Sequence, residues 1–287
     1  MLRSHRLAAV VVALCLPLSS ACTGPAAPGG SGRSSHGTPP PPAGAAPTDQ
    51  AAPPLPEGQE GGWELAFSDE FDGTSLDASR WADHSTAEPD QGRGNLDNQQ
   101  LEWNQAANCQ VSAGALVMTA KREQVTSPSG NRYDWTSCLI TTAGSYNFQY
   151  GYIEERSILP AERGFWPAFW TWQARGVDRH TETDVYEYYS DNRQKLYATQ
   201  YSSRQGRCDW RPSFDPTEDW HTYGAAIEAS GTTWYADGVQ VCHTDATSDG
   251  PTSIITNLAV YSQIPPDAAT TGATKRVDYV RAWKPAS

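Results

Sequence analysis

The stretch "TETDVYEYY", residues 181–189, places three carboxylates within six positions: Glu182, Asp184 and Glu187. Its aromatic and β-branched residues favour a strand, and strand side chains alternate between two faces. Simple alternation puts Glu182 and Asp184 on one face and Glu187 on the other. One β-bulge between Asp184 and Glu187 inserts an extra residue and brings all three acids to one face. The spacing therefore predicts a bulged strand.

The residues around the acids argue against the alternative interpretation, a solvated acidic strand. Four of them are large and aromatic or apolar: Val185, Tyr186, Tyr188 and Tyr189. They indicate burial, and buried like charges are costly unless they serve a function. On a curved strand the two glutamates can lean to about 5–5.5 Å apart, which is the separation that double-displacement glycoside hydrolysis requires.

A row of aromatic side chains lies just upstream, in "RGFWPAFWTW", residues 163–172. Strand alternation puts Trp166, Ala168, Trp170 and Trp172 on one face. Such a row offers flat platforms for sugar rings, although a packed core stripe is the alternative. Pro167 indicates an irregular strand, which is common at a binding site. We favour binding for Trp166 and Trp170 and leave Trp172 open.

The rest of the domain reads as short β-rich runs between turn clusters, without a convincing long amphipathic helix. The pair Asp237-Gly238 separates two such runs and predicts a tight hairpin. About 225 residues follow the N-terminal segments, enough for one large core. The pattern predicts an all-β sandwich of two stacked sheets. A net charge of −12 argues against nucleic acid as a partner.

Cysteine usage suggests an oxidising compartment. Four of the six cysteines lie in the domain, and an even number in an exported chain predicts two disulfides. Four cysteines allow three pairings. We favour Cys109–Cys138 and Cys208–Cys242, because each pair lies in neighbouring strand segments.

The N-terminus predicts export. Two arginines precede a short apolar stretch, and "LSSAC" ends at Cys22 in the manner of a bacterial lipobox. Residues 1–21 are thus expected to be a signal peptide and Cys22 a lipid anchor, with an ordinary signal peptide as the alternative. Residues 22–62 are rich in Pro, Gly, Ala and Ser and predict a disordered linker. Residues 63–287 form the folded domain.

Several segments occur in an order that resembles glycoside hydrolase family 16, in particular its laminarinase-like members. They are "FSDEF" (67–71), "YGYIEER" (150–156), "RGFWPAFW" (163–170), "ETDVYE" (182–187), "WHTYGAAIE" (220–228), "WYADG" (234–238), "NLAV" (257–260) and "VDYVRAW" (277–283). The resemblance implies a concanavalin-like β-jelly-roll sandwich of two curved antiparallel sheets, with a cleft on the concave face. It also implies retaining, endo-acting hydrolysis of a β-linked polysaccharide.

The resemblance assigns roles to the three acids. Glu182 matches the nucleophile, Glu187 the acid/base and Asp184 the acid between them. An acid/base must stay protonated until it donates, which needs a raised pKa. Negative charge on Glu182 and Asp184 would raise the pKa of Glu187; alternatively, Asp184 shares a proton with Glu182 and orients it. We expect the three to titrate as a coupled group.

Further contacts are implied by the same resemblance. Asn98 and Trp103 match a segment at the cleft edge, and Asn257 matches a cleft asparagine, although a buried Asn pinning the sheet would look the same. No cofactor is expected for catalysis. A structural calcium is expected at Glu70, the backbone of Gly114 and Asp278, with ordinary hydrogen bonds as the alternative reading of both carboxylates.

The sequence also departs from the family pattern. Tyr201 stands where members that cut β-1,3-glucan often carry a histidine, and "GRCDW" (206–210) adds Arg207 and Trp210 near the cleft. Arg163, at the start of the tryptophan segment, is a further candidate contact. These departures leave the acids intact and concern the residues that would select the bound sugar.

The function expected is endo-hydrolysis of a β-1,3-glucan or a mixed-linkage glucan by an extracellular monomer. Its partner is the polysaccharide, and it meets a membrane only through the anchor at Cys22. Two alternatives keep the chemistry: a galactan or another β-glycan as substrate, or transfer to a second sugar. A third is a non-catalytic glycan-binding protein on the same fold, although retention of all three acids argues against it.

Overall fold

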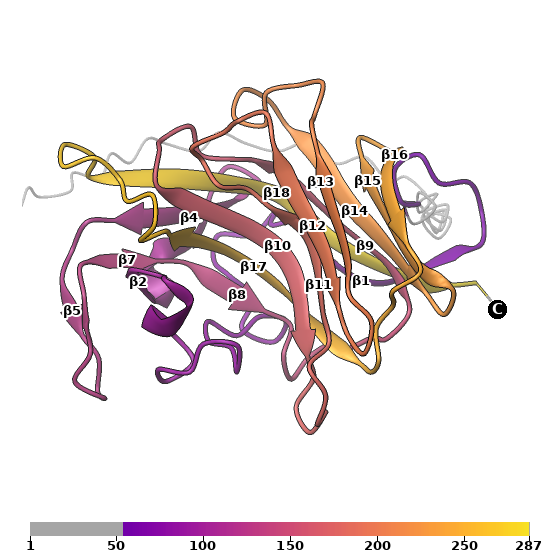
Figure 1. The fold of residues 1–287 in the computed structure, drawn as a ribbon, viewed down its shortest axis with the longest axis horizontal. Coiled ribbons are helices and arrows are strands. Elements are labelled where there is room, and N and C mark those ends of the chain that lie inside the picture. Colours follow the sequence, from indigo (N-terminus) through magenta and orange to yellow (C-terminus); the bar gives the residue numbers. More distant parts are fainter. Residues whose placement is uncertain (1–53, 287) are drawn as a thin grey trace, which may run out of the picture. The chain divides into compact units, whose positions relative to one another are not determined.

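The computed structural model describes residues 54–286. The predicted signal peptide (1–21), the anchor at Cys22 and most of the predicted linker lie outside the described residues. Within 54–286 the chain forms two large, mainly antiparallel sheets with little helix, which confirms the predicted all-β sandwich (Figure 1). None of the helices in this part of the chain is long and apolar enough to cross a membrane.

The smaller sheet has six strands and carries the acidic stretch. Its order is β13-β12-β11-β10-β17-β8, and every neighbouring pair is antiparallel. The strands are β8 (Leu139–Thr141), β10 (Phe165–Gln173), β11 (Glu182–Glu187), β12 (Leu196–Tyr201), β13 (Gly206–Trp210) and β17 (Thr252–Val260).

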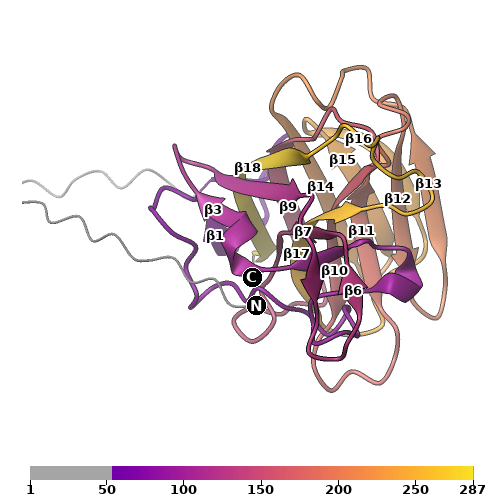
Figure 2. The same cartoon turned by 90° about the vertical axis from the view of Figure 1, so that its left-hand side faces the viewer.

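The larger sheet has ten strands and packs behind the smaller one (Figure 2). Its order is β16-β15-β14-β9-β18-β4-β7-β2, with β1 added to β18 and β3 to β4. The strands are β1 (Trp63–Asp69), β2 (Glu102–Asn104), β3 (Cys109–Val111), β4 (Leu116–Lys121), β7 (Trp135–Ser137), β9 (Gly151–Ile158), β14 (His221–Glu228), β15 (Gly231–Ala236), β16 (Val239–Thr244) and β18 (Gly272–Pro285). A small hairpin of β5 (Val125–Thr126) and β6 (Arg132–Tyr133) and two short 3₁₀ helices, η1 (Leu96–Asn98) and η2 (Ala106–Asn108), complete the fold.

The hydrophobic core fills the space between the two sheets. On β10 it takes Phe165 and Phe169, and on β11 it takes Val185 and Tyr186, all buried. The alternate residues of β10 point to the opposite, outer face of the six-stranded sheet. The tryptophan row therefore lies on the outer face, as strand alternation predicts for a binding surface.

A bulge at Val185 resets the alternation of β11. Ala168 and Phe169 of β10 pair with Glu187 and Tyr186, but the next residue pairs with Asp184, so Val185 is skipped. The register with β12 shifts at the same place. The larger sheet supports this irregularity, because the buried Trp234 indole donates a 2.8 Å hydrogen bond to the Asp184 carbonyl. The predicted bulge is confirmed.

The disulfides and the predicted hairpin also agree with the sequence. Cys109 pairs with Cys138, and Cys208 pairs with Cys242. The second bond joins β13 of the smaller sheet to β16 of the larger one. Asp237 and Gly238 both have positive φ, 45° and 71°, between β15 and β16, as a tight type I′ turn requires.

The end of the predicted linker is packed against the domain. The Trp283 indole donates a 2.7 Å hydrogen bond to the Pro54 carbonyl, and the Glu57 amide donates one of 3.0 Å to Glu154. Gly58 lies so close to Gly238 that a Cβ atom there would collide with its backbone. Residues 54–58 therefore contact the sheets, although they lie in the range predicted to be linker. Composition did not reveal these contacts because they consist of two hydrogen bonds, one glycine contact and one buried proline, Pro56, in a segment with few bulky apolar residues.

A fully buried ion pair lies between the sheets. Lys275 of β18 pairs with Glu155 of β9 at 3.0 Å, and both side chains are fully buried. The Lys275 ammonium also donates to the Ala168 carbonyl and to the Thr256 hydroxyl, at 3.2 and 2.6 Å. Tyr186, next to Glu187, donates a 2.7 Å hydrogen bond to Glu155. The pair thus links the larger sheet to β10, β11 and β17 directly beneath the acids.

Replacing Lys275 with Met is expected to destabilise the domain strongly, because it leaves the Glu155 charge buried without its partner. The expected loss in the free energy of unfolding is about 3–5 kcal/mol, measured by urea denaturation. The double variant Lys275→Met/Glu155→Gln should recover most of it. Lys284→Met removes the exposed pair with Glu64 and serves as the control, with a change below about 1 kcal/mol. Equal stability of both lysine variants would contradict this account.

Candidate active site

A cavity of about 570 Å³ lies on the outer face of the six-stranded sheet. Its floor comes from alternate residues of β10 and β11, and its walls from β12, β13, β17 and the loop around residues 87–100. Eight residues predicted from the sequence line it: Asn98, Trp166, Trp170, Glu182, Asp184, Glu187, Tyr201 and Asn257. Among these eight, Asn98 and Asn257 are 159 positions apart in the chain and line the same cavity.

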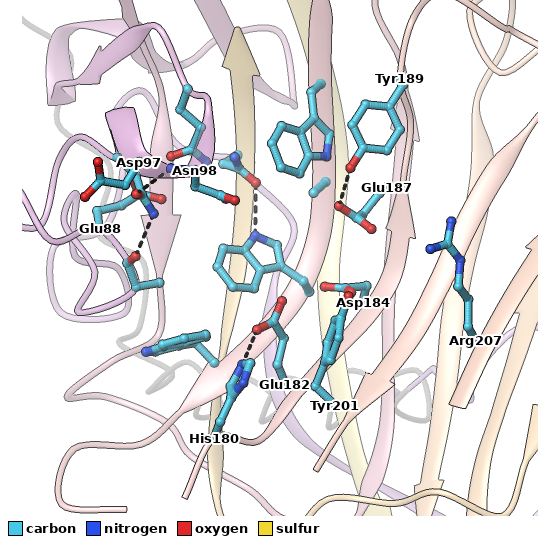
Figure 3. Close-up of a pocket in the computed structure, with 18 residues that line it drawn as sticks. Glu88, Asp97, Asn98, His180, Glu182, Asp184, Glu187, Tyr189, Tyr201 and Arg207 are labelled. Carbon is cyan, nitrogen blue, oxygen red and sulfur yellow. Dashed lines mark hydrogen bonds and ion pairs between the residues drawn. The ribbon is translucent and has the colours of Figure 1, made fainter. Parts of the chain in front are cut away.

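The three carboxyl groups point into this cavity from β11 (Figure 3). The Tyr189 hydroxyl donates a 3.0 Å hydrogen bond to Glu187. At the other end of the strand, Glu182 Oε2 lies 2.6 Å from Nε2 of His180. Asp184 lies between them and is buried. The bulge therefore places two carboxyls with different hydrogen-bond partners on either side of a third.

Burial sets the protonation of two of these acids. It raises the pKa of Glu187 to about 7, and the negative charge of Glu182 adds to this effect while the Tyr189 hydrogen bond opposes it. Burial also raises the pKa of Asp184 well above its ordinary 3.8, helped by the charges of Glu182 and Glu187. Burial and the two charged neighbours therefore favour the protonated form of Asp184. Glu187 is largely protonated below neutral pH.

The aromatic floor is fixed by specific contacts. The Trp170 indole donates a 3.0 Å hydrogen bond to the Asn257 side-chain oxygen. Trp166 stacks on Tyr189, with ring centroids 5.0 Å apart, and meets Tyr261 edge-on. Asn257 therefore lines the cavity and also holds the Trp170 indole in place. Trp172, left open from the sequence, lines the cavity as well.

Three predicted contacts lie elsewhere. Trp103 is buried and packs on Tyr133. Its strand, β2, belongs to the larger sheet. Gln100, three residues earlier in the chain, lines the cavity instead. Trp210 is buried in the core, since the odd positions of β13 face outward and the even positions inward. Arg163 precedes β10 on an exposed loop, near Asp267. The structure does not bring these three residues to the cavity.

Several residues that line the cavity were not predicted from the sequence. They are Ala87, Glu88, Asn95, Asp97, Gln100, His180 and Tyr189. Most come from the irregular loop before β2, which has no periodicity from which a face could be predicted. His180 and Tyr189 flank the acidic strand, so closeness in sequence to Glu182 and Glu187 was the available signal. Arg207, noted from its unusual segment, also lines the cavity.

The residues predicted to bind calcium do not fit that ion as they are arranged. The Nε and Nη2 atoms of Arg281 donate hydrogen bonds of 2.9 and 2.6 Å to the Glu70 carboxylate. Asp278 accepts a 2.7 Å hydrogen bond from Arg156. Residues 54–286 contain no group of three or more His, Cys, Asp or Glu side chains placed to hold a metal. Arginine cations occupy the carboxylates that the ion would need, so the calcium prediction is not supported.

Fold and site together define a class of protein. A β-sandwich whose open face carries a tryptophan floor and closely grouped carboxyls has the construction of a carbohydrate-active enzyme. The chain belongs to the glycosyl hydrolases family 16, whose sequence profile matches residues 95–281. This membership confirms the resemblance found from the ordered sequence segments.

Similar proteins agree with this assignment. Endo-1,3-1,4-beta-glycanase EglC of Rhizobium meliloti (strain 1021) is 32% identical over 240 residues, which cover 76% of this chain and 51% of that protein. Glucan endo-1,3-beta-glucosidase A1 of Niallia circulans is 29% identical over 266 residues, covering 78% and 38%. This chain therefore spans about half, or less, of the length of these curated relatives.

Solved structures match the fold of the domain. The catalytic domain of an endo-1,3-beta-glucanase (laminarinase) from Thermotoga petrophila RKU-1 superposes with a TM-score of 0.69 at 27% identity, covering 78% of this chain and 99% of that one. The endo-beta-1,3-glucanase from Pyrococcus furiosus gives a TM-score of 0.69 at 28% identity, covering 78% and 95%. Together with the two observed sheets, they confirm the predicted jelly-roll fold.

Replacing Glu88 with Gln is expected to stabilise the protein above neutral pH. Glu88 is buried in the cavity wall, its Oε2 atom has no hydrogen-bond partner among residues 54–286, and burial raises its pKa from 4.5 to about 7. Its folded pKa exceeds its unfolded pKa, so stability falls as the pH rises from about 4.5 to 7. At about 1.4 kcal/mol per pKa unit, the cost at pH 8 is roughly 3 kcal/mol.

Urea denaturation at pH 5 and pH 8 measures this effect. Glu88→Gln should exceed the wild type in stability at pH 8 and approach it at pH 5. The exposed Asp97 lines the same cavity, and Asp97→Asn is the matched control, with no such pH-dependent gain. A Glu88→Gln variant that gains nothing at pH 8 would show that Glu88 carries no raised pKa.

Proposed function

We propose that the domain hydrolyses a β-1,3-glucan or a mixed-linkage β-1,3-1,4-glucan at internal bonds, with retention of configuration. The grouping of Glu182 and Glu187 in one cavity by the bulge at Val185 carries this proposal. The family assignment supports glycoside hydrolysis. The names of the relatives, an endo-1,3-1,4-beta-glycanase and glucan endo-1,3-beta-glucosidases, favour these two linkages.

The first half of the reaction uses both glutamates. Glu187, protonated below about pH 7, gives its proton to the glycosidic oxygen as the bond from that oxygen to C1 breaks. A lone pair of the Glu182 carboxylate forms a new bond to C1 and yields a glycosyl ester. Glu187 is left as a carboxylate, and the sugar on the leaving side departs as an alcohol.

The second half reverses these roles. The Glu187 carboxylate removes a proton from a water molecule, whose oxygen attacks C1 while the bond to Glu182 breaks. Glu182 is again a carboxylate and Glu187 is again an acid. Two inversions at C1 give net retention. Asp184, whose pKa is raised mainly by burial, would share a proton with Glu182 and orient it, which is the second of the two roles expected for Asp184.

The sugar is expected to contact the aromatic floor and the walls of the cavity. Trp166 and Trp170 offer ring faces, and Asn98 and Tyr201 offer polar groups from opposite walls. A galactan remains the second candidate, since kappa-carrageenase of Pseudoalteromonas carrageenovora is 28% identical over 172 residues that cover 46% of this chain. A panel of laminarin, mixed-linkage glucan and carrageenan separates these substrates.

We propose that the domain, residues 63–287, acts outside the cell as a monomer. Two disulfides within the domain support an oxidising compartment. Residues 1–21 would direct export, lipid on Cys22 would hold the protein at the membrane, and the linker would separate the domain from it. Polysaccharide is the proposed partner.

Glu182→Gln is expected to abolish polymer hydrolysis, and Glu187→Gln to reduce it roughly 10²–10⁴-fold, measured as reducing ends from laminarin or mixed-linkage glucan. A glycoside with a very acidic phenol as its leaving group needs no protonation. It should therefore release its phenol rapidly from Glu187→Gln but not from Glu182→Gln. With the wild type, kcat/KM should fall above about pH 7 as Glu187 loses its proton.

The order of product anomers supplies the stereochemical evidence. Proton NMR of the wild-type reaction should detect the β-anomer first. Initial release of the α-anomer would exclude retention. Binding of the polymers without any cleavage would favour the glycan-binding alternative, and longer products at high substrate concentration would favour transfer to a second sugar.

Cys22→Ser is expected to move the protein from the membrane fraction to the medium, because the thiol that would carry the lipid is lost. Fractionation of the producing cells, followed by immunoblotting, measures this change. Cys15→Ser, within the predicted signal peptide, is the matched control and should leave the protein at the membrane. Wild-type protein found only in the medium would contradict anchoring and favour the ordinary signal peptide.

A further inference from the structure

His180 contacts the nucleophile but has no part in the mechanism above. It lies two residues before Glu182, and its Nε2 atom is 2.6 Å from Glu182 Oε2 (Figure 3). The imidazole is about half exposed, whereas the Glu182 side chain is only 16% exposed. Both line the same cavity. The contact is short enough for a charge-assisted hydrogen bond, which is about twice as strong as a neutral one.

Two aromatic rings hold the imidazole in place. It stacks on Tyr201 of β12 at an interplanar angle of 12°, with centroids 5.6 Å apart. It also packs on Trp172 of β10, with centroids 5.0 Å apart. The next residue, Thr181, is fully buried, and its hydroxyl lies 2.9 Å from that of Ser248. His180 is therefore a fixed element of the cavity wall, in spite of its exposure.

We propose that His180 is a positioning residue that acts through Glu182: its imidazolium binds Oε2, keeps the carboxylate ionised and fixes its rotation. This inference rests on the proposed function. The groups that face the ring are Glu182, Tyr201 and Trp172. The three other charged or titratable groups on the strands that line the cavity are Asp184, Glu187 and Arg207. The hydrogen bond with Glu182 raises the pKa of His180 above 6.5, so the cation persists in mildly acidic solution.

The pair has a direct consequence for the reaction. When Glu182 attacks C1, its carboxylate becomes a neutral ester, and the charge that attracted the imidazolium disappears. When water releases the sugar, the bonding electron pair returns to Glu182 and the ion pair forms again. The imidazolium thus stabilises Glu182 as a leaving group in the second step. It also preserves the ionised nucleophile when the pH falls.

The pH dependence of kcat/KM tests this role. The acidic limb reports protonation of Glu182, and the basic limb reports deprotonation of Glu187. Without the cation, Glu182 accepts a proton at higher pH, so the acidic limb of His180→Ala should move up by about one pH unit. The basic limb should stay in place. His180→Gln keeps a hydrogen-bond donor without the charge, so it should move the limb equally but retain more activity on the plateau.

His243→Ala is the matched control. His243 is a half-exposed histidine beside Asp245, on β16 of the other sheet, and its removal should leave the profile unchanged. A loss of activity at every pH without movement of the acidic limb would overturn the proposal, because it would indicate only a structural role. The proposed function would survive that result, provided that wild-type protein cleaves the polymer.

A second measurement does not depend on activity. NMR titration of the His180 ring should give a pKa above 6.5 in wild-type protein and a lower value in Glu182→Gln, where the negative partner is lost. The spectrum of His180→Gln assigns the signal. An equal His180 pKa in both proteins would overturn the ion pair, whatever the protein cleaves.

Discussion

The skipped residue in β11 is the constraint on which the rest of the site depends. A regular strand would send Glu182 and Glu187 to opposite faces, one toward solvent and one into the core between the sheets. Skipping Val185 against β10 and β12 removes that conflict. The same shift keeps Val185 and Tyr186 in the core, so the strand satisfies the core and the cavity together. The Trp234 indole and the buried ion pair beneath β10 hold this arrangement from the second sheet.

The pKa values of Asp184 and Glu187 depend more on the burial of these carboxyl groups than on any single neighbouring charge. Burial is the main cause of the raised pKa of both Asp184 and Glu187, and the neighbouring negative charges come second. The sequence suggested the reverse emphasis, with charge repulsion raising the pKa of Glu187. The raised pKa values of Asp184 and Glu187 reduce the repulsion that three carboxylates charged together at one site would cause. Different surroundings thus give chemically identical side chains different roles.

Strand periodicity predicted much of the fold and of the cavity floor. It placed Trp166 and Trp170 on the open face and indicated the bulge, because both depend only on local alternation. Periodicity did not place Trp103 and Trp210 correctly. To predict whether a side chain faces the cavity, one must also know to which sheet its strand belongs and which face of that sheet is outward. The wall formed by residues 87–100 has no periodicity, so only tertiary structure reveals Glu88 and Gln100. The contacts of Pro54 and Glu57 were not predicted for a similar reason, since their partners lie more than 90 positions away in the chain.

We infer that the bulge sets Glu182 and Glu187 on either side of one glycosidic bond. A crystal structure with an oligosaccharide spanning the cavity tests it most directly, through the separation of the two carboxyl groups. We expect about 5–5.5 Å, with one glycosidic oxygen beside Glu187 and its C1 atom facing Glu182. A separation of about 6.5–9.5 Å, with a water molecule between Glu182 and the sugar, would contradict double displacement and indicate inversion. A Glu187 side chain turned into the core would contradict the bulge itself.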